Sequence, residues 1–192
     1  MQKNSFQDFL PEIKTSKLLL HTCCSPCAVE AVEKITSNDI SLQLYFYNPN
    51  ITDPIEYEKR LKEVKKLADF FKIPLFIDEF NPADFLCEIK GLEAEPEKGD
   101  RCAKCFLMRL SRMRNFAEKH KINFTTSVLG VSRWKDFDQT ARAGMEAFLS
   151  ANGTEYLPIN WRKNNSEPRR LSLIKEQKIY QQNYCGCPFS KK

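Results

Sequence analysis

Short apolar runs alternate with amphipathic stretches along most of the chain. The apolar runs at 17–21, 41–47, 73–77 and 122–129 predict buried strands, and residues 155–160 are a candidate fifth strand. Apolar side chains recur at helical spacing in the stretches 28–35, 54–71 and 101–121, and again between residue 136 and about residue 150. This alternation predicts an α/β fold with a doubly wound parallel sheet.

Turn and cap signals divide the chain further. Asp53 and Pro54 suit the start of the long helix, and Asn152-Gly153 suits the end of a later one. We predict a polar lead-in before residue 17, a short helix at 81–89, a turn-rich loop at 91–100 and a last helix at about 170–180. The expected organisation is a single α/β domain, 1–192, with a Rossmann-like core at 17–160 and a basic C-terminal segment at 161–192 that bears Cys-Gly-Cys.

Composition places the chain among ordinary soluble proteins. It is 42% hydrophobic and 29% charged, and its net charge of +5 permits a polyanionic partner without requiring one. No apolar run approaches the roughly 18 residues of a membrane span. The first residues lack the apolar region of a signal peptide. We therefore expect a cytoplasmic protein without a membrane partner.

Eight cysteines are the main chemical signal, because clustered cysteines in the cytosol more often bind metal or catalyse than form disulfides. Cys87 stands alone on an apolar helix face, where we expect a small buried hydrophobic residue. The other seven form three tight groups: Cys23, Cys24 and Cys27; Cys102 and Cys105; Cys185 and Cys187.

The first group lies between the first predicted strand and its helix. Ligands bind beyond the carboxyl ends of strands in open α/β sheets, and the positive end of a helix dipole favours a thiolate. The pairs Cys24-x-x-Cys27 and Cys102-x-x-Cys105 together predict a shared metal. Zinc and an iron–sulfur cluster carry similar weight from this spacing, and a thioredoxin-like dithiol carries less.

Two features favour metal with redox chemistry over a closed zinc site. Cys23 is adjacent to Cys24, and vicinal thiols rarely serve one structural zinc. The thiols also exceed the four that such a site uses. For Cys185 and Cys187, a role as ligands or as a redox disulfide is about as well supported as an inert pair.

Longer motifs resemble those of the QueH-type epoxyqueuosine reductases. They span nearly the whole chain in the family's order. The matching stretches are His21-x-Cys23-Cys24-x-Pro26-Cys27, Phe46-Tyr47-Asn48-Pro49-Asn50-Ile51, Tyr57-x-x-Arg60, Gly91-Leu92-Glu93-x-Glu95-Pro96-Glu97, Arg101-Cys102-x-x-Cys105-Phe106 and Tyr180-x-Gln182-Asn183-Tyr184-Cys185-Gly186-Cys187.

The resemblance implies a core similar to that of the adenine-nucleotide α-hydrolase and PP-loop proteins. It implies a cobalamin-independent oxidoreductase that converts epoxyqueuosine to queuosine at the wobble position of tRNA with a GUN anticodon. A [4Fe–4S] cluster, an additional iron ion and an electron donor that the motifs do not identify are implied as well. The candidate metal ligands are Cys23, Cys24, Cys27, Cys102 and Cys105, without a division between cluster and iron. Gln181 and residues 132–136 depart from the family pattern, which bears on substrate contacts.

Removing the epoxide oxygen requires two electrons, two protons and a group that holds the oxygen. Our hypothesis is that three cysteines hold the cluster and leave an open iron position that acts as a Lewis acid. Protons could come from Asp136, Lys135, Tyr184 or a thiol of the Cys185/Cys187 pair. For Lys135 and Asp136, a purely structural role at the start of the next helix is as well supported as a role in proton transfer. The catalytic candidates are Cys23, Cys24, Cys185, Cys187 and Asp136.

Cationic side chains are the candidates for tRNA contacts, although any one of them more often belongs to a solvated helix face. Trp134, Trp161 or Tyr184 could stack on a base. The preferred substrate-binding residues are Arg101, Lys104, Arg109, Tyr184 and Lys135. The wider set adds Arg112, Arg114, Lys119, Lys121, Arg162, Lys163, Arg169 and Arg170.

Other classes of protein remain open at this point. A zinc-stapled structural or RNA-binding module would be colourless, and a metal-free dithiol oxidoreductase would not respond to chelation. A PP-loop-like tRNA sulfur transferase needs a glycine-rich phosphate loop after the first strand. Residues 22–27 contain no glycine there, so we do not expect ATP use.

Overall fold

The sheet is parallel throughout and has five strands. The computed structural model describes residues 3–14, 16–132 and 134–191. Within these residues the strand order is β3 (Leu75–Ile77), β2 (Ser41–Phe46), β1 (Lys17–His21), β4 (Phe124–Ser127) and β5 (Glu155–Tyr156). The predicted α/β class and the parallel sheet are confirmed.

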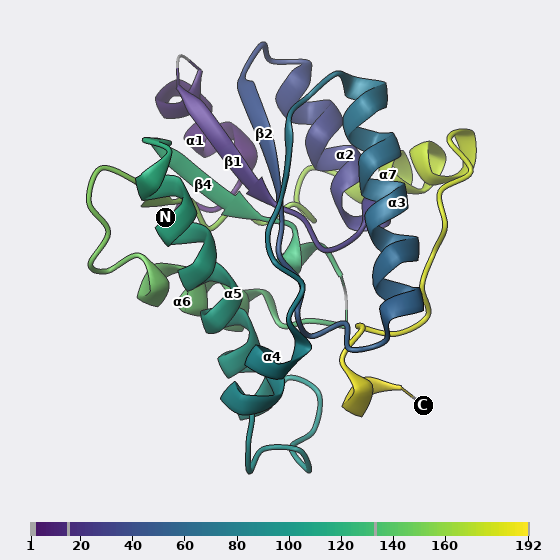
Figure 1. Ribbon diagram of the computed structural model, residues 1–192. Coiled ribbons are helices and arrows are strands. Elements are labelled where there is room, and N and C mark those ends of the chain that lie inside the picture. Colours follow the sequence, from purple (N-terminus) through teal and green to yellow (C-terminus); the bar gives the residue numbers. More distant parts are fainter. Residues whose placement is uncertain (1–2, 15, 133, 192) are drawn as a thin grey trace.

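Helices cover both faces of the sheet (Figure 1). The group formed by α2 (Ser25–Thr36), α3 (Pro54–Phe71) and α7 (Ser166–Glu176) lies on one side, and α5 (Asp100–Lys119) packs with α6 (Phe137–Ala147) on the other. The short helix α4 (Pro82–Glu88) contacts α5. None of the described helices has both the length and the apolar character needed to cross a membrane.

The central strand, β1, determines where a ligand can bind. β1 pairs with β2 on one side and with β4 on the other, and Leu18, Leu19 and Leu20 are completely buried. The chain runs outward from β1 through β2 to β3, and then returns to place β4 on the opposite side of β1. Such a switch point opens a crevice beyond the strand ends, here after His21 and Ser127.

The predicted polar lead-in is wrong, because it forms the helix α1 (Phe6–Ile13). Ser5 caps this helix through a reciprocal capping box with Asp8. Phe6, Phe9 and Ile13 are buried, and the Phe6 ring lies 5.6 Å from that of Trp161. Three apolar positions at helical spacing were the available signal.

Four other predictions need correction. The fourth strand ends at Ser127, because the buried residues that follow form a 3-10 turn, η1 (Leu129–Val131), and do not pair. β5 is only two residues long, and the last α-helix begins at Ser166 rather than near residue 170. Cys87 is exposed, because α4 directs Phe85 into the core instead. A further 3-10 turn, η2 (Pro188–Ser190), follows the Cys-Gly-Cys sequence.

Candidate metal centre

Cys23, Cys24 and Cys27 form what we call the three-thiol group, and it lies at the switch point. Cys23 and Cys24 follow β1, Cys24 is the N-cap residue of α2, and Cys27 lies in the first turn of that helix. All three side chains are buried. The end of β1 and the start of α2 therefore bring the three thiols together at the crevice.

Within the described chain, the three-thiol group is the only set of three or more His, Cys, Asp or Glu residues whose ligand atoms all lie within 4.8 Å of one another. The Sγ atoms of Cys23 and Cys24 are 3.8 Å apart. In a tetrahedral site with metal–sulfur bonds of about 2.3 Å, two sulfur ligands lie about 3.8 Å apart. The spacing therefore fits ligands of a single ion.

The three thiols share negative charge. Hydrogen bonds from the other two thiols hold the pKa of Cys23 well below its ordinary value. The hydrogen bond to Cys23 is the largest cause that raises the pKa of Cys24, to about 11, and the same contact raises the pKa of Cys27. A metal cation would replace the protons that the group keeps, since the thiolate is the binding form.

The remaining clustered cysteines, Cys102, Cys105, Cys185 and Cys187, form a second set that we call the four-thiol group. Cys105 and Cys187 are buried in one apolar cluster, with Cys185 packed against them. Burial raises the pKa of Cys102, where Cys185 adds to the increase. Burial also raises the pKa of Cys105 to about 12, where Cys185 and Cys187 contribute. The set joins the first two turns of α5 to the C-terminal tail.

In this arrangement the two CxxC pairs, for which we predicted a shared metal, lie in different groups, and the shared metal stays a prediction. Cys24 and Cys27 belong to the three-thiol group, whereas Cys105 packs with Cys185 and Cys187, and Cys102 packs against the edge of the main core. The physical reason is that α5 begins beside α4 and the tail, outside the turn that follows β1. Cys185, whose role the spacing left undecided, lies with the second pair.

Two cationic residues lie between the thiol groups. The buried Arg109 donates one hydrogen bond to the Asn48 side chain and another to Cys105 Sγ at 3.9 Å. Burial works to lower the pKa of Lys135, but Cys185 and the three-thiol group outweigh it, so the pKa is raised. Both cations therefore compensate negative charge on sulfur.

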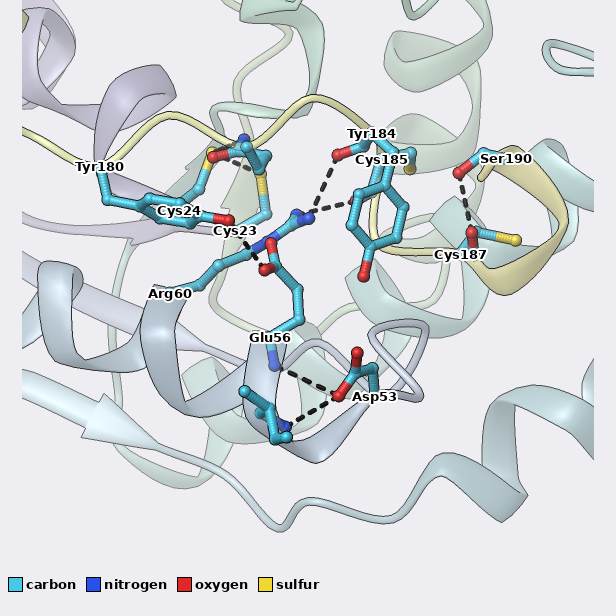
Figure 2. Close-up of polar contacts among 12 residues, drawn as sticks. Cys23, Cys24, Asp53, Glu56, Arg60, Tyr180, Tyr184, Cys185, Cys187 and Ser190 are labelled. Carbon is cyan, nitrogen blue, oxygen red and sulfur yellow. Dashed lines mark hydrogen bonds and ion pairs between the residues drawn. The ribbon is translucent and has the colours of Figure 1, made fainter. Parts of the chain in front are cut away.

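The C-terminal tail crosses the buried face of α3 on its way to the thiols. Arg60 donates to the carbonyl oxygens of Tyr184 and Cys185, and its guanidinium lies 5.3 Å from the Tyr184 ring (Figure 2). Gln182 donates from Nε2 to Cys24 Sγ at 3.0 Å. The tail thus contacts the three-thiol group and also supplies two members of the four-thiol group.

The structure buries two of the five preferred substrate-binding residues, Arg101 and Arg109. Arg101 is buried and donates to the carbonyl oxygens of Glu93 and Glu95, which anchors the 91–99 loop. Lys104 is exposed and pairs with Glu88 at 3.7 Å. Of the preferred set, only Lys135 and Tyr184 are half-buried beside the thiols.

Several members of the wider cationic set are also engaged. Arg112 pairs with Asp78 at 2.9 Å. The others donate to backbone carbonyls or pair with carboxylates: Arg114, Arg162, Arg169 and Arg170. Trp161 is buried and donates to the carbonyl of Ser127, so it cannot stack on a splayed base as it stands. Trp134 is exposed; Arg133 lies outside the described residues.

Asp136 is the N-cap of α6, where it accepts a hydrogen bond from Gln139 N at 2.8 Å. Asparagine also caps well, whereas alanine costs about 1 kcal/mol of stability. We therefore expect Asp136→Asn to keep the unfolding free energy of the parent protein and Asp136→Ala to lower it by that amount in a denaturant titration. If the side chain only caps the helix, Asp136→Asn retains turnover. Loss of turnover in a fully stable Asp136→Asn variant would instead assign it to proton transfer.

Sequence reasoning gave no role to Glu56, Arg60 or Asn48 beyond their motifs. A detectable signal was the placement of two charged residues, at positions 56 and 60, on the otherwise apolar stripe of α3.

His21 hydrogen-bonds Ser127 and the carbonyl of Tyr47, and burial is the main cause that lowers its pKa to about 3. Its hydrogen-bond partners therefore lie at the ends of β4 and β2.

Comparison with known proteins agrees with this architecture. A family model described as "Epoxyqueuosine reductase QueH" matches residues 18–192. The protein of that name from Haemophilus influenzae is 41% identical over 175 residues, which cover 91% of this chain and 71% of that protein. The protein of that name from Acinetobacter baylyi is 38% identical over 190 residues, which cover 99% of this chain and 87% of that protein.

A solved structure shows the same fold. The U34-tRNA thiolase NcsA from Methanococcus maripaludis with its [4Fe-4S] cluster has a TM-score of 0.60 to this chain and 15% sequence identity. The match covers 97% of this chain and 70% of that one. The fold is thus the one that the motif resemblance implied, and the sequence relationship is much closer to the reductases. The chain belongs to the QueH family of epoxyqueuosine reductases.

Proposed function

We propose that this protein reduces the epoxide of epoxyqueuosine, at the wobble position of tRNA with a GUN anticodon, to the alkene of queuosine. The observation that carries the proposal is the pair of adjacent thiol groups at the switch point of a chain from this family. A binding module stapled by one zinc needs four thiols and leaves the other three without a purpose. A sulfur transferase of the PP-loop type would need the glycine-rich loop that residues 22–27 lack.

The three-thiol group fits the additional iron. Its sulfur spacing matches ligands of one ion, and three protein ligands leave one tetrahedral position for substrate. This changes our initial hypothesis, which gave three cysteines to the cluster. A cubane separates its cysteine ligands by the inorganic core, so the 3.8 Å contact between Cys23 and Cys24 favours one ion over a cluster at this group.

The four-thiol group fits the [4Fe–4S] cluster. Three of its cysteines pack together in one apolar cluster, and Cys102, one turn earlier on α5 than Cys105, brings the number to the four that such a cluster takes. Its surroundings are apolar, with Phe85, Ile89 and Met108 in contact with the thiols. An apolar shell excludes water from a redox centre and tunes its potential.

The two centres together would supply electrons and a Lewis acid for the departing oxygen. The protein's own residues then orient the reaction. Arg109 and Lys135 balance the charge of the thiolates, and Lys135 carries a proton at Nζ beside both thiol groups. Tyr184 presents a half-buried ring on Arg60, where it can stack against a base. We assign Lys135 and Tyr184, rather than Arg101 or Arg109, to the substrate side.

The test is anaerobic purification with iron and sulfide reconstitution, followed by turnover of tRNA that contains epoxyqueuosine with dithionite as electron source. We expect a brown protein, five iron atoms for four sulfides if both sites fill, and queuosine in the digested tRNA. A colourless protein with stoichiometric zinc and no queuosine would overturn the proposal in favour of the structural module. As a matched control, tRNA of the same sequence without the epoxide should remain unchanged.

A further inference from the structure

Arg60 is a buried cation with an unusual set of partners. Its side chain is 2% exposed, and Nε donates to Glu56 Oε1 at 2.6 Å. The two terminal nitrogens donate to the carbonyl oxygens of Cys185 at 2.9 Å and Tyr184 at 3.1 Å. The guanidinium fork therefore binds one carboxylate of its own helix and two consecutive carbonyls of the tail.

Glu56 holds the same tail from its other oxygen. Tyr180 Oη donates to Glu56 Oε2 at 2.9 Å, and Figure 2 shows this contact beside the arginine. A buried ion pair is weak evidence for stability, because desolvation of both charges offsets their attraction. Both Arg60 and Glu56 bind residues of the tail, so we interpret the ion pair as a device that holds the tail in place.

The same guanidinium lies next to the three-thiol group. Figure 2 shows it between Cys23 and Cys24 on one side and Tyr184 and Cys185 on the other. The tail residue Gln182 bonds to Cys24 from the same region. One buried positive charge thus lies between the two thiol groups.

Gly186 allows the tail to approach this closely. Its φ is +106°, and an added Cβ would lie 2.8 Å from Ile51 and 3.1 Å from Arg60 Nη1. A side chain at this position would displace the backbone from the guanidinium. The glycine between the two cysteines is therefore required by the contact with Arg60.

We propose that Arg60 is a positioning residue for both thiol groups. It fixes Cys185 and Cys187 against the first two turns of α5 by binding the tail carbonyls, and it places a fixed positive charge beside both centres. The second part rests on the proposed function, because it concerns the loaded cluster. The first part concerns the protein alone.

The first test measures how fast iodoacetamide alkylates Cys185 in the full-length, metal-free protein, relative to the exposed Cys87 in the same sample. In Arg60→Gln we expect this ratio to rise by about tenfold or more, as when a docked segment opens locally. Arg60→Lys should give an intermediate ratio, since one ammonium cannot bind Glu56 and both tail carbonyls with the geometry of the guanidinium. Arg112→Gln, which removes an exposed arginine from its pair with Asp78, is the control and should leave the ratio unchanged. An equal ratio in the parent protein and Arg60→Gln would overturn the positioning role.

The second test is a redox titration of the reconstituted cluster. Removing a positive charge disfavours the reduced, more negative state, so Arg60→Gln should lower the midpoint potential, whereas Arg60→Lys should stay near the parent value. An unchanged potential in Arg60→Gln would overturn the charge role.

If no cluster assembles in the parent protein, the proposed function fails while the alkylation test still decides the positioning role. If Arg60→Gln does not fold by circular dichroism, Gly186→Ala should give the same rise in Cys185 alkylation, and an unchanged ratio there overturns the role.

Discussion

Cys105→Ala should abolish both the visible absorbance and the activity of the reconstituted protein. Cys105 is buried among Phe85 and Ile89, so neither water nor another side chain can replace its sulfur. We expect loss of nearly all acid-labile sulfide and a fall in turnover of at least about a hundredfold, beyond the usual effect of a residue that only supports a metal ligand. Sulfide analysis, the absorbance spectrum and queuosine formation measure the three effects.

Cys87→Ala is the matched control, because it removes an exposed thiol from the neighbouring helix α4. It should keep iron, sulfide and turnover at parent levels. A Cys105→Ala protein that retains its sulfide would show that the four-thiol group does not hold the cluster.

Cys24→Ala should separate activity from colour. The three-thiol group has the spacing of ligands to one ion, and Cys24 lies 3.8 Å from Cys23 in that group. We expect this variant to keep its sulfide and absorbance, to lose about one iron atom per chain, and to lose turnover by at least about a hundredfold, since the open coordination position disappears with the ion. Iron and sulfide are measured on the same sample.

The comparison between the two cysteine variants decides the division of the thiols. If Cys24→Ala loses sulfide and Cys105→Ala keeps it, the assignment of cluster and ion is reversed. If both variants lose all sulfide, the seven thiols hold one combined centre.

Much of the fold could be predicted from sequence because the sheet is buried on both faces. The first strand is a run of three leucines, which is typical of such a strand, and its predicted bounds are those observed. The start of α3 at Asp53 and Pro54 was also predicted, since both residues act locally. The helix α1 was missed because Pro11, which lies inside it, is more typical of a loop, although three of its apolar side chains are buried.

The site was harder to predict, since spacing does not show which distant segments meet. The sequence pairs Cys102 with Cys105, but only the tertiary fold brings Cys187 into the same apolar cluster. Arginines on α5 look alike in sequence, yet Arg109 is buried between the thiol groups and Arg112 pairs at the surface with Asp78. Their roles depend on the rotation of the helix against the sheet.

The four-thiol group has a consequence for the order of assembly in the cell. The ribosome makes the chain from its N-terminus, and every strand of the sheet precedes residue 160. Cys102 and Cys105 are therefore released from the ribosome well before Cys185 and Cys187. During synthesis the nascent protein presents only half of this group of thiols. Under the proposed assignment of the cluster to the four-thiol group, a cluster delivered by a carrier would be fully ligated only after translation has passed Cys187, and cofactor insertion would be a late event in maturation.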